Sequence, residues 1–164
     1  MAKIHPQISE ELKSFIEAQH IFFTGTAMKD GRVNVSPKGM DSLRVTGPNK
    51  IIWRNVAGSG NKTATRLQHV NRINLMWCAL EEKPLILRCY GSAKIYNEKD
   101  SEFAQYNALF PVSNGARKIF EVDVDTIQTS CGFAVPLMDF KEERQVLAKW
   151  AENKGLQGSR NYWE

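Results

Sequence analysis

The chain alternates short runs of apolar and β-branched residues with polar turn sequences, and segments of helical periodicity lie among them. Apolar residues three or four positions apart predict helices over residues 7–19, 100–109 and 140–153. A shorter helix, capped by Ser59 or Asn61, is predicted to run to about His69. The residues from 155 onwards are polar, and we expect an irregular tail there.

Apolar, aromatic and β-branched runs between turn signals such as Asp30-Gly31 indicate about seven strands. They are predicted over residues 20–27, 32–36, 43–46, 50–55, 72–80, 85–96 and 116–126, and residues 127–135 are expected to extend the sheet. Because short links join successive strands, we expect a mostly antiparallel sheet that curls and closes into a small barrel. There is no β–α–β alternation, which argues against a Rossmann fold.

Two of these strands carry more specific signals. Gly91, in the middle of a long strand, indicates a bulge or the close approach of another backbone. Residues 116–126 alternate clearly, with Phe120, Val122 and Val124 on one side and Ile119, Glu121, Asp123 and Asp125 on the other. This alternation predicts one buried face and one polar face.

Composition narrows the class of protein. A chain of 164 residues with 42% hydrophobic and 24% charged residues is typical of one soluble globular domain, which we expect to span residues 1–164. A net charge of +4, with scattered lysines and arginines, gives little support to nucleic-acid binding. No apolar run is long enough for a membrane span, and the N-terminus does not resemble a signal peptide. The three cysteines show no CxxC spacing and the three histidines form no HxH or HxxxH, so we expect reduced cysteines, a cytoplasmic protein and no metal site.

The segment from Arg32 to Arg66 carries the candidate chemistry. It places Lys38 at a strand end, and Lys62 and Thr63 in the first turn of the predicted short helix. The loop GSGNKT resembles a phosphate-binding turn in composition, although it is neither a P-loop nor GxGxxG. A helix N-terminus offers free N–H groups and partial positive charge, so this loop is interpreted either as a phosphate site or as a solvated loop.

Two large side chains leave alternatives open. Trp53 either stacks on a planar ligand or belongs to the core. Arg88, within an apolar strand, either extends its guanidinium to a rim or pairs with an anion.

The order of RVNVSPKG, IIWRN, GSGNKTATRL, NRINLMWCA and LILRCYGSAKIY resembles the pyridoxamine 5'-phosphate oxidase-like family over about residues 8–137. The resemblance implies a mainly β fold with peripheral helices, a six-stranded antiparallel split β-barrel. It also implies a homodimer that binds FMN in a cleft at the dimer interface. Residues 138–164 would then form a C-terminal helix and tail, whose Tyr162 and Trp163 either pack on the partner or stay free.

This chain matches the family's cofactor-binding sequence pattern at some positions and departs from it at others. Val33 to Lys38 matches the FMN-contacting strand, with valine where the true oxidase has arginine, and Lys62 and Thr63 match its basic pair on the phosphate. Trp53 and Arg54 match positions beside the isoalloxazine or ribityl group, and Ile86 to Arg88 match a strand near the flavin. The implied cofactor-binding residues are Val35, Ser36, Pro37, Lys38, Trp53, Arg54, Asn55, Ser59, Gly60, Asn61, Lys62, Thr63 and Arg88.

The C-terminus GSRNYWE lacks the histidine-bearing motif with which the true oxidase holds pyridoxal phosphate, which argues against vitamin B6 oxidation. The resemblance therefore implies an FMN-dependent oxidoreductase acting on an unidentified small molecule, with no side chain singled out as catalytic. The alternative is a non-catalytic protein that stores or senses flavin, or binds a deazaflavin or haem.

Overall fold

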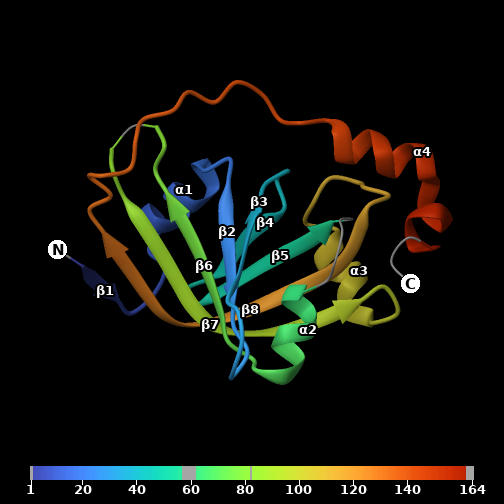
Figure 1. Cartoon of the computed structure of the whole chain (residues 1–164), viewed down its shortest axis with the longest axis horizontal. Coiled ribbons are helices and arrows are strands. Elements are labelled where there is room, and N and C mark those ends of the chain that lie inside the picture. The colour runs from blue at the N-terminus through green and yellow to red at the C-terminus, as the bar shows by residue number, and fades with distance from the viewer. Residues whose placement is uncertain (1, 57–61, 82, 162–164) are drawn as a thin grey trace.

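A curled antiparallel sheet with helices at its margins forms the body of the protein (Figure 1). The computed structural model describes residues 2–56, 62–81 and 83–161. The predicted loop residues Ser59, Gly60 and Asn61, and the tail residues Tyr162 and Trp163, lie outside these ranges.

The described strands and helices match most of the sequence prediction in order. The strands are β1 (Lys3–His5), β2 (Phe22–Thr26), β3 (Asn34–Lys38), β4 (Leu43–Gly47), β5 (Lys50–Val56), β6 (Ile73–Cys78), β7 (Ile86–Asn97) and β8 (Ala116–Ser130). The helices are α1 (Glu10–Ala18), α2 (Lys62–His69), α3 (Ser101–Asn107) and α4 (Val146–Asn161). The sequence did not reveal β1, because three residues are too few to show a strand's alternation. β1 pairs with the end of β8.

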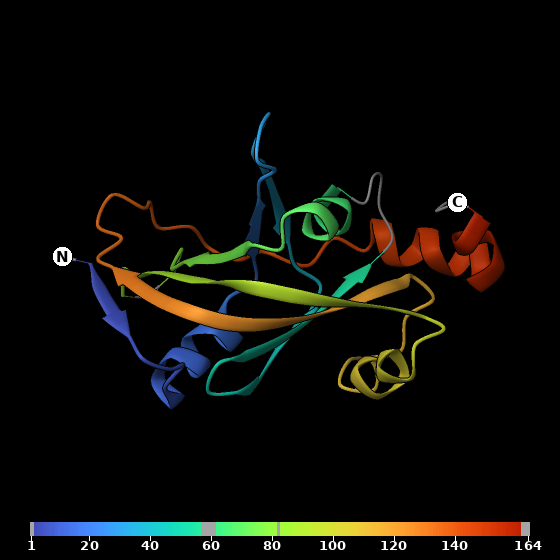
Figure 2. The same ribbon diagram turned by 90° about the horizontal axis from the view of Figure 1, so that it is seen from below.

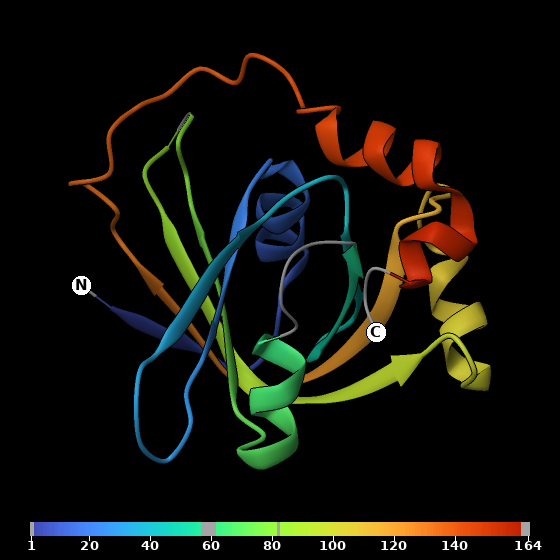
Figure 3. The ribbon, with the colours of Figure 1, turned by 45° about the vertical axis from the view of Figure 1, so that its right-hand side comes forward.

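Every strand pair among the described residues is antiparallel, and the main path runs β3-β2-β6-β7-β8-β5-β4. The sheet curls without closing, since the edge strands β3 and β4 pair with one neighbour each (Figure 3). The prediction of a closed barrel was therefore wrong in this respect, and the fold is a split barrel. β3 and β4 are consecutive in the chain, and Met40 and Asp41 between them have positive φ of 63° and 48°.

One large core fills the concave side of the sheet. Trp53 and Trp77 are 1% exposed, and Trp53 stacks on Phe120 with ring centroids 4.4 Å apart. Helix α1 contributes Leu12 and Ile16 to this core, and its first turn is capped by the Ser9 hydroxyl, which accepts the Leu12 N–H. Burial of these apolar side chains is the main force that holds the curled sheet together.

The predicted polar face of β8 is only partly polar. Ile119 is 0% exposed and Glu121 is 4% exposed, although both lie on the side opposite Phe120 and Val122. Helix α3 covers this side, where Phe103 and neighbours form a second apolar cluster with Ile52 and Ile119 (Figure 2). The strand alternates as predicted, but a helix from elsewhere in the chain buries the second face as well.

The C-terminal region differs from its prediction. β8 ends at Ser130, so the sheet does not extend to residue 135, and α4 starts at Val146 rather than near 140. Helix α4 continues to Asn161 across a kink at Gly155. An irregular tail was predicted from residue 155 onwards. Residues 131–145, here named the C-terminal segment, arch across one end of the sheet between β8 and α4 (Figure 1). Among the described helices, none is long and apolar enough to cross a membrane.

Candidate functional site

The edge strand β3 organises the predicted site residues. It pairs with β2 on one side only, so its other edge has backbone groups with no strand partner. Pro37 fits there because proline cannot donate to a ladder. Val35 and Pro37 lie on the convex face of the sheet and are exposed, whereas Ser36 and Lys38 lie on the concave side.

Lys38 ends β3 on the concave side, and burial lowers its pKa below the usual lysine value. Its ammonium lies 5.5 Å from the centroid of the Trp53 ring. Among the described residues, no carboxylate forms an ion pair with it. Lys38 is thus a partly desolvated cation whose charge has no opposite partner in the described chain.

A row of side chains crosses the convex face through Arg88. The strand registers align Pro37, Phe23, Met76, Arg88, Gln128 and Ile4. Arg88 is half-buried and donates to the Ser130 hydroxyl at 3.3 Å. The described residues provide no anionic partner for Arg88, which the ion-pair interpretation would require. The guanidinium lies on the opposite face of the sheet from Lys38.

Three polar atoms lack partners at the hairpin end of β2, β3 and β6. Buried atoms of Thr26, Asn34 and Asn74 find no hydrogen-bond partner in the described part of the chain. Buried polar atoms usually have partners, so each is available to a ligand. Helix α2 contacts β2, and Arg66 of α2 donates to the Arg32 carbonyl of the same hairpin. This contact places the middle of α2 beside the hairpin, and the hairpin lies toward the end of α2 that leads into β6 (Figure 3).

The remaining predicted residues divide between core and surface. Trp53 is enclosed by core side chains, so the core interpretation holds in this chain. Arg54 is 3% exposed and donates to the Pro111 carbonyl at 2.6 Å, beneath α3. Burial lowers the pKa of Arg54. Asn55 is half-buried near the end of β5, Lys62 is exposed, and Thr63 is buried at the start of α2.

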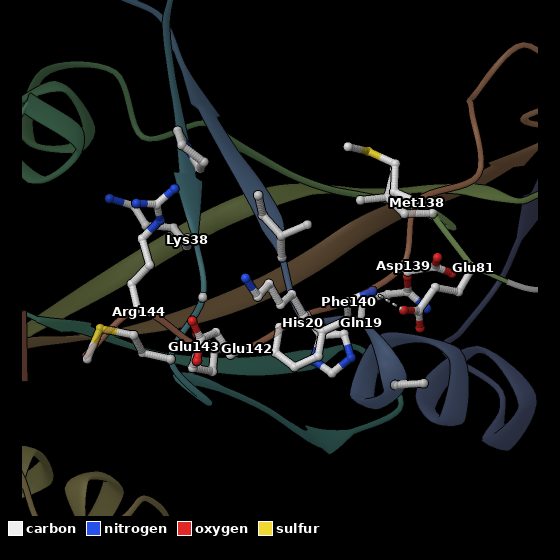
Figure 4. Close-up of a pocket in the computed structure, with 17 residues that line it drawn as sticks. Gln19, His20, Lys38, Glu81, Met138, Asp139, Phe140, Glu142, Glu143 and Arg144 are labelled. Atoms are coloured by element: carbon white, nitrogen blue, oxygen red, sulfur yellow. Dashed lines mark hydrogen bonds between the residues drawn. The ribbon is translucent and has the colours of Figure 1, made fainter. Parts of the chain in front are cut away.

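A cavity of about 590 Å³ opens at the end of the sheet where β3 finishes. Lys38 lines one wall, and the C-terminal segment lines the other (Figure 4). Phe140 of that segment stacks on His20, with ring centroids 3.6 Å apart and planes at 8°. The Phe140 N–H donates to a Glu81 carboxylate oxygen at 2.8 Å, which ties the segment to the loop after β6.

Sequence reasoning missed this cavity and the orphaned polar atoms. His20, Glu81 and Phe140 are far apart in sequence, and no spacing links them. Asn34 and Asn74 looked like ordinary strand residues, and only the register of three strands brings them to one end of the sheet. The described residues contain no cluster of three or more His, Cys, Asp or Glu side chains able to hold a metal ion.

Comparison with known proteins gives one curated relative and several similar structures. Pyridoxamine 5'-phosphate oxidase family protein ustO of Aspergillus flavus is 33% identical over 144 residues, which are 85% of this chain and 58% of that protein. This chain thus spans a little over half of its relative's length.

Two solved structures illustrate the shared fold. HupZ of Group A Streptococcus matches with a TM-score of 0.59 and 20% identity, over 73% of this chain and 91% of that one. An FMN-binding protein of Syntrophomonas wolfei matches with a TM-score of 0.51 and 14% identity, over 77% and 84%. The family model described as pyridoxamine 5'-phosphate oxidase matches residues 8–131, about three quarters of the chain. The chain therefore belongs to the pyridoxamine 5'-phosphate oxidase family.

Proposed function

We propose that this protein binds FMN and acts as a flavin-dependent oxidoreductase on a small molecule. One observation carries the proposal in a chain of this family: β3 has at one end a lysine with no described carboxylate partner, and near its other end, on the same face, the unpartnered polar atoms of Thr26 and Asn34. Bound FMN supplies the hydride or electron chemistry, and the protein's part is to hold, orient and electrostatically tune it.

The hairpin end suits the phosphate and the polar chain of FMN. Lys62 and Thr63 begin α2, where free N–H groups and the helix dipole favour an anion. At the β2–β3 hairpin, on the face of Lys38, the Asn34 amide is an unpartnered donor, and the hydroxyl of its register partner Thr26 has no described partner either. These groups satisfy what a phosphorylated polyol requires, so the residues present fit the cofactor.

The other end of β3 suits the ring system. The Lys38 cation would stabilise negative charge that develops on a reduced flavin, because partial burial reduces screening by water. The free backbone edge of Val35 to Lys38 offers groups that hydrogen-bond a planar heterocycle. Because β3 rises roughly 3.3 Å per residue, a ligand that contacts both of its ends must lie extended along the strand.

We further propose that a second copy of the chain covers the convex face and completes the FMN cleft. Ile4 and Val35 are 61% and 62% exposed on that face, and Arg88 lies between their strands. The free edge of β3, which borders both faces, gives a planar ligand one wall, and enclosing the ligand requires a second. Measuring the molar mass in solution tests this point, and a monomeric FMN-loaded protein would contradict it.

The first experiment is an absorbance spectrum of the purified protein, followed by denaturation and identification of any released chromophore. Flavin bands with FMN released support the proposal. A colourless protein that also fails to bind added FMN overturns it. A haem band, or affinity for a deazaflavin alone, would support the binding-protein alternative instead.

A double variant tests the assigned residues. Lys38→Ala with Lys62→Ala should weaken FMN binding at least 100-fold, because both proposed cationic contacts are removed. The matched control is Lys94→Ala with Lys99→Ala, two exposed lysines of the far end of β7 and the following turn. FMN affinity should not change in this control. Equal affinity of both double variants would exclude the assigned phosphate and ring contacts.

Catalysis needs its own test, because a binding role remains the second candidate. Its support is that the described ion pairs include no residue of β3, so no acid–base pair is evident there. Stopped-flow reduction of the bound flavin by NADH or NADPH, followed by oxidation with small acceptors, distinguishes the two. Failure of reduction under all these conditions would favour storage or sensing.

A further inference from the structure

The net positive charge of the chain is concentrated at one end of the molecule. Two segments meet there: residues 27–33, which form the turn of the β2–β3 hairpin, and residues 62–72, which are helix α2 and the turn after it. They hold five of the 22 lysines and arginines and one of the 18 acidic residues. The remaining 17 basic and 17 acidic residues balance each other. The whole net charge of +4 therefore lies in these two segments, here named the basic end.

Hydrogen bonds hold the two segments of the basic end together, although they are far apart in the chain. Arg66 of α2 donates to the Arg32 carbonyl. Arg72 donates to the Met28 carbonyl on the other side of the hairpin turn. Because both acceptors are neutral, these contacts position the guanidinium groups and leave their charge uncompensated. None of the described ion pairs includes a residue of the basic end.

The hairpin turn projects from the body of the protein beside α2 (Figure 2). Lys29, Asp30 and Arg32 are exposed in this turn. Val33 follows them and is 68% exposed. The basic end thus presents several cations around an apolar side chain at a projecting tip.

We propose that the basic end docks on the surface of a membrane that contains anionic lipids. The negative potential of such a surface attracts each nearby lysine or arginine. Val33 would enter the boundary between headgroups and acyl chains, as apolar side chains of peripheral proteins do. The long side chains of Lys29 and Arg32 would keep their charges at the level of the headgroups.

The composition of the basic end favours a lipid surface over a protein or a nucleic acid. Its two segments contain no Phe, Trp or Tyr. Protein interfaces usually depend on aromatic anchors and are depleted in lysine, and single-stranded nucleic acids are usually held by stacking on aromatic rings. The phosphate backbone of a duplex would attract the cations but offers no apolar counterpart to Val33. An anionic lipid surface provides both.

This inference does not rest on the flavin role proposed above. Lys62 is the one charged residue of the basic end that the flavin role also uses, and the two segments carry a net charge of +3 without it. The cavity beside Lys38 lies at the other end of β3. Docking by the basic end would therefore leave that cavity accessible from solution.

Co-sedimentation with lipid vesicles tests the inference, with the full chain and FMN added in excess. At low salt, vesicles of phosphatidylcholine with about 30% phosphatidylserine should bind the protein about tenfold or more tightly than vesicles of phosphatidylcholine alone. High salt should remove most of this binding, because it screens the surface charges. Equal binding to both kinds of vesicle, or no binding to either, would overturn the inference.

Matched double variants locate the docking surface. Lys29→Gln with Arg32→Gln should weaken binding to the anionic vesicles about 25-fold, since each cation near the surface contributes roughly fivefold. Lys94→Gln with Lys99→Gln changes the net charge equally at exposed positions outside the basic end, and should weaken binding no more than about twofold. Circular dichroism and thermal unfolding check that each variant is folded. Equal losses in the two variants would show a response to overall charge and would refute this surface.

Val33→Ser distinguishes a lipid surface from other polyanions, because it removes the exposed apolar side chain and keeps every charge. It should weaken vesicle binding about threefold. A fluorescently labelled DNA duplex is the second probe. If the duplex binds more tightly than the vesicles and Val33→Ser changes neither affinity, the basic end is a nucleic-acid site and the inference is wrong.

FMN affinity, measured in the same variants, separates this inference from the proposed function. Loss of vesicle binding with unchanged FMN affinity in the Lys29 and Arg32 double variant supports a docking surface apart from the cofactor. A parallel loss of both affinities would show that these cations serve the cofactor, and the inference would be wrong. A protein that binds anionic vesicles but never binds FMN would refute the proposed function and support the docking surface.

Discussion

The two halves of the curled sheet differ in how many of their faces the chain itself covers. Around β5 and the first part of β8, both faces are buried, with Ile52 and Ile119 at 0% exposure beneath α3. Across β2, β6 and the first part of β7, the core fills the concave face, while Met76 and Arg88 remain partly exposed on the convex face. One continuous strand, β8, passes through both environments.

The difference separates residues that hold the fold from residues free for binding. In the half covered on both faces, Glu121 accepts from Lys50 and from the Tyr96 hydroxyl, and Arg54 donates to the Pro111 carbonyl although its Nε has no described partner. In the half covered on one face, the Asn74 oxygen has no described partner and Arg88 has no described carboxylate. We therefore expect substitutions in the first half to change stability, and those in the second to change binding.

The largest effect should come from Gly91, close to where the two halves meet. β7 and β8 shift register there, and a Cβ on Gly91 would lie 2.0 Å from the Asp123 carbonyl oxygen. Gly91→Ala should cost about 3 kcal/mol or more in the free energy of unfolding, because backbone must move. Chemical denaturation measures this cost.

Gly25→Ala is the control for that prediction. A Cβ at Gly25, on the convex face, would meet Asn74 atoms no nearer than 3.7 Å, an ordinary contact. Its stability should therefore stay within about 0.5 kcal/mol of the parent protein. Similar losses for both variants would contradict the assigned crowding at Gly91.

The second effect compares two Lys–Glu pairs. Glu121→Ala should cost about 2 kcal/mol at neutral pH, since it leaves the Tyr96 hydroxyl without its acceptor and Lys50 with Asp123, at 3.3 Å, as its remaining described ion-pair partner. Glu17→Ala, which removes the exposed partner of Lys13 in α1, should cost no more than about 0.5 kcal/mol. If the two costs were equal, the Glu121 pair would be no more important than a surface ion pair.

The pH dependence sharpens this comparison. Burial alone would raise the pKa of Glu121, but hydrogen bonds from Lys50 and Tyr96 outweigh it, and the pKa lies below its ordinary value of 4.5. A lowered pKa gives stability that is present above the ordinary pKa and is lost as pH falls through the lowered one. The parent protein should therefore lose more stability on acidification below about pH 4.5 than Glu121→Gln, as urea titrations at several pH values would measure. Parallel losses would exclude the carboxylate as the source.

The smallest effect on stability should come from replacing Arg88, in the row of side chains that crosses the convex face. Arg88→Met keeps the apolar stem and removes the charge, so unfolding should change by less than about 0.5 kcal/mol. FMN affinity, measured by quenching of flavin fluorescence, should fall about tenfold if Arg88 lies in the cleft between two copies. Lys94→Met, at an exposed lysine farther along the same strand β7, is the control and should retain full affinity. If Arg88→Met lowered stability and left FMN affinity unchanged, Arg88 would be a structural residue and the convex face would not be assigned to binding.

Periodicity and turn chemistry were sufficient for the order of elements. The Asp30-Gly31 turn, the Gly91 bulge and the antiparallel order follow from local rules of backbone conformation. The motifs also indicated the family correctly, because its strand and loop sequences are contiguous in the chain. The site residues implied by that resemblance remain proposals, and Ser59, Gly60 and Asn61 among them lie outside the described residues.

Only the tertiary structure decided which faces are covered. Alternation in β8 predicted an apolar and a polar side, but α3, which precedes β8 in the chain, buries Ile119 and Glu121 on the second side. The open split between β3 and β4, the unneutralised state of Lys38, and the meeting of His20 with Phe140 depend on contacts between distant segments. The sequence by itself determined the strands, the turns and the family, because these depend on neighbouring residues. Burial and charge pairing depend on long-range packing, which no local pattern contains.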